Sequence, residues 1–386
     1  MRILYVNHTK KISGAGLSLS TLIKYLPANI ARYFWLPAGS EIDAKLGATP
    51  ENTFHDRYLC QFMTTLYGDG YTLSLYIWHI LKGIAAVPRL RSRIKKWKIN
   101  LIHINETTLL AYAFAASLYN IPFVLHARTA LKKRPIETFL LRRLAALRRF
   151  CIIAIDEEVK KSFPSECQRF IDVIYNPIEI GPSPSLSETE KLRKEWGIFP
   201  TDIVVGQVAS LHSAKGIWMI LEIAEKLCAS TSNVRFVLVG DFSAEAGEGP
   251  KLKQAILDKG LETRIILPGY HTNLPLVYSS IDIALCLFGE GLGGVGRTAY
   301  EAALCGKALV ATIPEPDNSQ TLQNRKTGLL FTPEDRAGIE NGIQLLIKDA
   351  AYRTQLGECA KKTIGERHDP RMIAGQVLAV YTRLLA

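Results

Sequence analysis

Residues 281–312, IDIALCLFGEGLGGVGRTAYEAALCGKALVAT, contain the pattern that decides the fold. An apolar strand pattern is followed by a glycine-rich loop, a short helical pattern that ends near Gly306, and a second strand pattern, ALVAT. Strands that alternate with helices predict a parallel sheet. Because glycine has no Cβ, the loop allows backbone N–H groups to lie against a ligand. We therefore expect a ligand site where this loop meets its helix.

The same alternation of strand and helix patterns runs along the whole chain of 386 residues, a length that favours two domains. The proline-rich stretch NPIEIGPSPSLSETE at 176–190 is typical of a linker between domains. We predict an α/β fold of two Rossmann-like, doubly wound domains that face a cleft. The first domain spans 1–180 and is joined by a C-terminal helix at 371–386, and the second spans 191–370.

Charge is distributed unevenly between the two halves. Residues 1–185 carry 25 Lys and Arg against 13 Asp and Glu, whereas the remainder carries 22 against 23. Basic runs at 82–98 and 127–149 suit an anionic membrane surface or a phosphate-bearing ligand, and they suit a solvated helix face equally well. We expect no nucleic-acid partner.

The cysteine pattern and the apolar runs indicate where in the cell the protein resides. The seven cysteines form no CxxC pair and no Cys/His cluster with zinc spacing, so we expect reduced core thiols and no metal site. The opening MRILYVN leads into a glycine-rich turn rather than a signal peptide, and no segment reaches the ~20 apolar residues of a membrane span. These patterns predict a cytoplasmic protein.

Two further loops have the character of ligand sites at strand ends. In HTKKISGAGLSLS, Gly14 and Gly16 allow amides to approach an anion at a helix that begins near Leu17, although a tight turn explains the pattern equally well. In ASLHSAKGIWMI, Lys215 lies at the start of a helix, where a cation beside free amides suits a diphosphate; the alternative is a solvent-facing lysine.

Glu301 has two interpretations. Thr298 and Glu301 fit a capping box, T-x-x-E, at the start of the helix in AYEAALCG. The alternative is a carboxylate that binds a ligand. Composition does not separate the two.

Several stretches together resemble a known family. They are IPFVLHART (121–129), VIYNPIE (173–179), VRFVLVGD (234–241), LPGYHTNLPLVYSSIDIALCLF (267–288), EAALCGKALVAT (301–312) and KTGLLFTPED (326–335). In this order they are similar to the retaining nucleotide-sugar glycosyltransferases of family four, also called group 1, which have the two-domain GT-B architecture. The resemblance covers most of the chain.

The resemblance implies roles by position. Lys215 would contact the donor diphosphate, Glu301 would hold the ribose hydroxyls, and His126 would lie near the transferred sugar. The other donor-site positions, which include the residues around the phosphate, sugar and base, are Gly14, Gly16, Ser210, Gly269, Tyr270, Gly294, Val295, Gly296, Arg297 and Thr298.

Two positions depart from the family pattern. Gly293 stands where a first glutamate is usual, and the nearest glutamate is Glu290. Either Glu290 reaches the sugar from a longer loop, or the chain lacks that interaction and prefers a different donor. Ser210 stands where an arginine usually partners the lysine. Two alternatives stay open. A GT-B-like sugar-nucleotide epimerase would share the fold and the donor site, and the departures at Ser210 and Gly293 suit a binding subunit with impaired activity.

We therefore expect a retaining glycosyltransferase that moves a hexosyl unit from a UDP- or GDP-sugar to a glycan or lipid-linked glycan in surface polysaccharide biosynthesis. Helix N-termini and Lys215 suit stabilisation of the departing diphosphate without a metal or other cofactor. The basic first half suits peripheral attachment to the inner face of a membrane.

Overall fold

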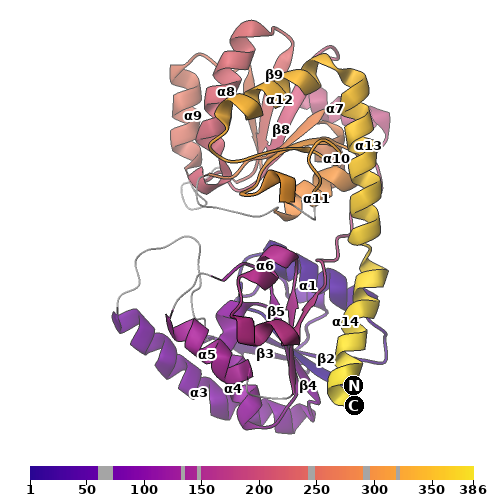
Figure 1. The fold of residues 1–386 in the computed structure, drawn as a ribbon. Helices are drawn as coiled ribbons and strands as arrows, with labels where there is room; N and C mark the ends of the chain where they lie inside the picture. Colours follow the sequence, from indigo (N-terminus) through magenta and orange to yellow (C-terminus); the bar gives the residue numbers. More distant parts are fainter. Residues whose placement is uncertain (60–72, 132–134, 146–148, 242–247, 290–295, 319–321) are drawn as a thin grey trace. The chain divides into compact units, whose positions relative to one another are not determined.

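A computed structural model describes residues 1–59, 73–131, 135–145, 149–241, 248–289, 296–318 and 322–386 (Figure 1). The chain forms two compact units, each with its own parallel sheet. The first unit is Met1–Glu179 together with His368–Ala386, and the second is Ile180–Arg367. The expected α/β fold with two Rossmann-like domains is confirmed.

The first unit contains a seven-stranded sheet in the order β3-β2-β1-β4-β5-β6-β7. Its strands are β1 (Arg2–Val6), β2 (Ala31–Pro37), β3 (Thr53–Asp56), β4 (Leu101–Ile104), β5 (Phe123–Ala127), β6 (Phe150–Ala154) and β7 (Ile171–Val173). Its α-helices are α1 (Gly14–Tyr25), α2 (Asp43–Leu46), α3 (Leu73–Trp97), α4 (Leu110–Leu118), α5 (Pro135–Ala145), α6 (Glu157–Lys161) and α14 (Pro370–Leu385), and its 3₁₀ turns are η1 (Thr107–Leu109) and η2 (Ser165–Phe170).

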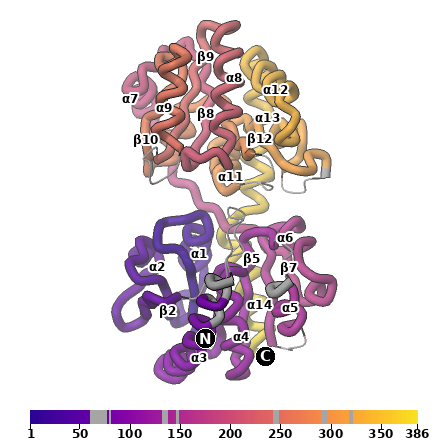
Figure 2. The backbone as a smooth tube through the Cα atoms, turned by 90° about the vertical axis from the view of Figure 1, so that its left-hand side faces the viewer, coloured from indigo at the N-terminus to yellow at the C-terminus, as the bar shows by residue number. Residues whose placement is uncertain are grey.

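Helices cover both faces of this sheet because its strands are apolar on both sides. One face packs against α3, α4 and α5. The opposite face packs against α1 and α14, where Ile3, Leu101 and Val124 of neighbouring strands meet Ile373 and Val377 of α14. The last helix of the chain, drawn in yellow in Figure 2, thus completes the core of the first unit.

The second unit contains a six-stranded parallel sheet in the order β10-β9-β8-β11-β12-β13. Its strands are β8 (Ile203–Val208), β9 (Val234–Val239), β10 (Ile265–Gly269), β11 (Ile283–Cys286), β12 (Ala308–Thr312) and β13 (Leu329–Phe331). Its α-helices are α7 (Leu186–Glu195), α8 (Ile217–Ser230), α9 (Gly249–Asp258), α10 (Leu274–Ser279), α11 (Arg297–Leu304), α12 (Arg336–Lys348) and α13 (Ala350–Arg367), and its 3₁₀ turns are η3 (Ser213–Lys215) and η4 (Pro316–Asn318).

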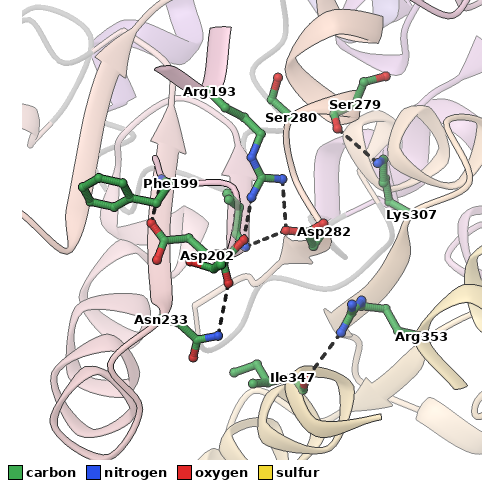
Figure 3. A network of polar contacts seen from close by, with 12 residues as sticks. Arg193, Phe199, Asp202, Asn233, Ser279, Ser280, Asp282, Lys307, Ile347 and Arg353 are labelled. Carbon is green, nitrogen blue, oxygen red and sulfur yellow. Dashed lines mark hydrogen bonds and ion pairs between the residues drawn. The ribbon is translucent and has the colours of Figure 1, made fainter. Parts of the chain in front are cut away.

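A polar network ties α7 to the amino-terminal edge of the second sheet (Figure 3). Arg193 donates to the backbone oxygen of Asp202 at 2.5 Å and pairs with the Asp282 carboxylate at 3.4 Å. Asp282 also accepts from the Val204 amide at 2.8 Å. Since Asp202 and Asp282 precede β8 and β11, these contacts lie at the edge opposite the strand ends that carry the glycine-rich loops.

We expect Arg193→Ala to lower the free energy of unfolding by about 1–3 kcal/mol, because the oxygens of Asp202 and Asp282 lose their charged donor. Thermal and urea unfolding measure the change. The control is Lys226→Ala, which removes an exposed pair with Glu340 at 3.1 Å and should cost less than about 1 kcal/mol. Equal losses in the two variants would contradict the role given to this network.

Candidate functional site

A cavity of about 170 Å³ opens at the carboxyl-terminal edge of the second sheet. Its walls come from the end of β8 and the loop that follows, from the residues that end β11 and follow it, and from the start of α11. The lining residues are Gln207, Ala209, Ser210, Lys215, Cys286, Leu287, Phe288, Gly296, Arg297 and Thr298. The structure therefore brings Ser210, Lys215, Gly296, Arg297 and Thr298, five of the predicted positions, to one cavity.

Lys215 is the lysine among the residues that line this cavity. Its Nζ lies 4.3 Å from the centroid of the Phe288 ring. Burial lowers the pKa of Lys215. The next residue, Gly216, has φ of +63°, and a Cβ there would lie 3.0 Å from the backbone oxygen of Leu287, so the turn that orients Lys215 favours glycine. An anion in the cavity would offset the cost of burying this cation.

Two buried side chains hold the walls of the cavity in place. Gln207 donates from Nε2 to the Lys215 backbone oxygen at 2.6 Å and accepts from the Leu287 amide at 2.9 Å. Thr312 accepts from the Phe288 amide through Oγ1 at 2.7 Å. The sequence interpretation missed both residues. A single polar residue inside an apolar strand, as in IVVGQV, is the signal that would have indicated Gln207.

Glu301 lies on α11 but does not line the cavity, and it is 5% exposed. Its Oε1 accepts from Arg297 Nε at 2.7 Å, one helical turn away. Burial raises the pKa of Glu301, whereas the Arg297 guanidinium opposes that shift. The carboxylate is held by a cation inside the protein.

The capping-box interpretation is wrong. Gly296 precedes α11, Thr298 lies inside the helix, and the Glu301 carboxylate bonds to Arg297 instead of returning to a backbone amide. The helix ends as expected, with Gly306 at φ of +71° directly after the cap residue Cys305.

Three predicted donor-site positions lie outside the described residues, namely Glu290, Gly294 and Val295, and so does the departure at Gly293. Gly269 and Tyr270 lie at the end of β10 and away from the cavity lining. Gly269 has φ of +90° and its oxygen accepts from the Gly240 amide at 3.0 Å. The Tyr270 side chain is 69% exposed.

Gly14 and Gly16 lie in the first unit, at the start of α1. The helix begins at Gly14, not near Leu17, because Ser13 caps it by accepting from the Gly16 amide at 3.2 Å. A Cβ on Gly16 would lie 2.5 Å from Cδ1 of Ile42. Gly16 thus serves close packing, and its amide is already bonded within the protein.

His126, at the end of β5, is fully buried in the first unit. Its Nδ1 lies 3.3 Å from Arg128 NH2 and 3.2 Å from His103 Nε2, and His103 Nδ1 lies 2.6 Å from the Tyr381 hydroxyl. An arginine only donates, so His126 Nδ1 is the acceptor and the neutral ring carries its proton on Nε2. Burial, with Arg128 nearby, holds the pKa of both histidines well below the usual range.

Arg128 connects this histidine pair to Asn105, which follows the neighbouring strand β4, and to Asn176, which follows β7. Its Nε donates to Asn105 Oδ1 at 2.8 Å, and its NH1 donates to Asn176 Oδ1. Asn176 also bonds His368 through its backbone oxygen at 2.8 Å. Arg128 and Asn105 were not among the residues predicted from the sequence. Their signal was a polar residue directly after each buried strand of a parallel sheet.

Within the described ranges, no three His, Cys, Asp or Glu side chains gather as a metal-binding group. None of the described helices has both the length and the hydropathy that a membrane crossing requires.

Comparison with known proteins defines the class. The family model of glycosyl transferases group 1 matches residues 188–363, and that of glycosyltransferase family 4 matches residues 50–181. Both models describe glycosyltransferases, and the group 1 match includes every residue that lines the cavity of the second unit.

The chain is similar to several particular proteins. It is 23% identical to the poly(ribitol-phosphate) alpha-N-acetylglucosaminyltransferase of Staphylococcus aureus (strain COL), over 56% of this chain and 42% of that protein. It is 23% identical to the N-acetyl-alpha-D-glucosaminyl L-malate synthase of Bacillus anthracis, over 50% of this chain and 49% of that protein. The chain thus spans about half the length of these curated relatives.

A crystal structure of Anabaena Alr3699/HepE in complex with UDP has the same fold, with a TM-score of 0.78 and 23% identity. The match covers 99% of this chain and 100% of that chain.

We expect Arg297→Ala to destabilise the protein by about 2–3 kcal/mol near neutral pH, because Glu301 would remain buried without its cation. A carboxyl whose pKa is raised by folding lowers stability as the pH rises from its unfolded pKa towards its folded pKa. The loss relative to wild type should therefore shrink as the pH falls from neutral towards the ordinary carboxyl pKa of about 4.5. Urea denaturation at several pH values measures the loss of stability. A loss that does not depend on pH would contradict an ionised Glu301 in the variant.

Proposed function

We propose that the protein transfers a sugar from a UDP-sugar to a glycan acceptor of the bacterial cell surface, with retention of anomeric configuration. The observation that carries this proposal is the cavity in which Lys215 lies beside the start of α11, inside the region matched by the group 1 model. The HepE structures in complex with UDP and with UDP-glucose support the choice of uridine nucleotide. The name of the Staphylococcus aureus relative includes poly(ribitol-phosphate), which supports the choice of a polymeric acceptor.

The proposed chemistry follows from charge. Cleavage of the anomeric C–O bond develops negative charge on the departing diphosphate. Lys215 is a half-buried cation at the cavity, and the amides at the start of α11 add the positive end of a helix dipole. We propose that these groups stabilise the leaving group, and that this requires no metal or other cofactor.

The proposal includes retention of the anomeric configuration of the transferred sugar. None of the ten described residues that line the cavity carries a carboxylate that could act as a covalent nucleophile. This composition favours displacement on one face of the sugar, as the resemblance implies. Glu301 would hold the ribose hydroxyls while Arg297 keeps its carboxylate in place.

Isothermal titration calorimetry with UDP, GDP and ADP, followed by turnover assays with UDP-hexoses, tests the proposal. Binding of UDP with sugar transfer to a glycan supports it. Release of a free sugar inverted at C2 would instead indicate an epimerase, and binding without any turnover would indicate an impaired binding subunit.

Lys215→Ala should lower kcat/KM by a factor that corresponds to about 2–3 kcal/mol of lost transition-state stabilisation. This is the range for a charged hydrogen bond to a buried anion. Lys226→Ala is the matched control, because Lys226 is an exposed lysine of the same unit that does not line the cavity. Steady-state kinetics with the donor decides the outcome. If both variants keep wild-type kinetics, the diphosphate does not bind at Lys215.

Glu301→Gln should weaken UDP binding by about 1.5–3 kcal/mol and change the melting temperature little, because glutamine keeps one oxygen for Arg297 but replaces the other acceptor by a donor. Calorimetric titration and thermal unfolding give the two quantities. Glu340→Gln, at the partner of Lys226, is the control and should change neither. Wild-type affinity in Glu301→Gln would remove Glu301 from the ribose site.

A further inference from the structure

The outer surface of α3 exposes large apolar side chains in a row. Ile77, Trp78, Leu81 and Ile84 are 50%, 49%, 53% and 63% exposed. Their spacing places Ile77, Leu81 and Ile84 on one side of the helix. Other residues of the helix, Ala86, Leu90 and Trp97, pack into the core. The apolar row therefore does not serve the core of the first unit.

All the charged side chains of α3 are basic. The segment Leu73–Trp97 contains six Lys and Arg residues and no Asp or Glu. Exposed Arg91, Lys95 and Lys96 continue the outer surface beyond the apolar row. Lys82 lies over the Trp78 ring at 5.2 Å, so a cation and an aromatic side chain are paired within the row itself.

The neighbouring helices also expose large apolar side chains. α4 contacts both α3 and α5, and it leaves Leu118 exposed at its end. In α5, Phe139 is 53% exposed and Arg143 lies over its ring at 5.1 Å. Figure 1 shows α3, α4 and α5 together on one side of the first sheet. We call the exposed residues Ile77, Trp78, Leu81 and Ile84 of α3 the apolar face.

A shallow groove of about 270 Å³ lies beside the apolar face and shares Trp78 and Leu81 with it. It is lined by Tyr58, Trp78, Leu81, Lys82, Ala85 and Arg89. Arg89 already pairs with the buried Asp56 at 2.8 Å, whereas Lys82 bonds only to the aromatic ring among the contacts of the described residues. The groove thus offers apolar walls with a cation at the rim, which suits acyl chains whose headgroups are anionic.

We propose that the apolar face lies in the headgroup region of an anionic membrane, with its four side chains inserted and Lys82, Arg91, Lys95 and Lys96 on the lipid phosphates. Charge complementarity favours this occupant, because a helix of 25 residues without a single acidic side chain meets anionic lipid without local repulsion. The inference deepens the proposed function by naming the surface on which the acceptor is presented. It depends on the proposed function only for the identity of that acceptor.

Vesicle sedimentation of the full chain tests the proposal. We expect binding to phosphatidylglycerol/phosphatidylcholine vesicles that weakens as salt rises from about 0.1 M to about 0.5 M, and little binding to pure phosphatidylcholine. The double variant Leu81→Ser, Ile84→Ser should bind anionic vesicles at least about tenfold more weakly, because two inserted side chains are removed. Leu186→Ser, Phe199→Ser is the matched control, since these residues are 82% and 61% exposed in the second unit.

A second measurement does not depend on serine variants. Tryptophan emission of the wild-type chain should shift to shorter wavelength when anionic vesicles are added, and Trp78→Phe should remove most of that shift. UDP binding, measured in parallel, should be the same in all these variants, so that failure of the membrane site is distinguished from failure of the donor site.

Three results would overturn the proposal. They are equal binding to neutral and anionic vesicles, an equal loss in the control variant, and a blue shift that persists in Trp78→Phe. Binding of soluble polyglutamate at the apolar face, with no binding to vesicles, would indicate an acidic protein partner instead.

Discussion

Parallel pairing of strands is the constraint on which the rest of the structure depends. Because every strand of each sheet runs in the same direction, all the carboxyl ends of a sheet share one edge, and the loops that follow β8 and β11 must meet there. Gln207 makes this proximity specific, since one side chain of β8 bonds both the Lys215 backbone and the Leu287 amide. The cavity is therefore a product of strand direction and of a few buried polar contacts.

Charges at these edges are buried in different ways. Glu301 is neutralised by Arg297, and His126 stays neutral because burial and Arg128 oppose protonation. Lys215 instead rests on an aromatic ring, which compensates a buried cation less completely than a carboxylate does. Lys215 is therefore the group that gains most from an incoming anion. Glu301 and His126 already accept hydrogen bonds from Arg297 and Arg128.

The sequence predicted what depends on local pattern and missed what depends on tertiary contact. Alternating strand and helix patterns predicted both sheets. The structure then brings the predicted site residues of the loop after β8 and of α11 to one cavity. The capping box failed because Arg297 lies one turn from Glu301 and competes for its carboxylate. Arg128, Asn105 and Gln207 stand out locally as polar residues within or directly after apolar strands, but the sequence does not indicate the distant partners that make them part of a site.

The position of α14 has a consequence for biosynthesis. The first unit is built from the beginning and the very end of the chain, and Tyr381 of α14 bonds His103 in the centre of its sheet. A ribosome releases these last residues only after the whole second unit has been made. The first sheet must therefore wait, with the part of one face that α14 covers left open, while the later unit folds. Nascent chains stalled before α14 should be the form of this protein that most needs a chaperone.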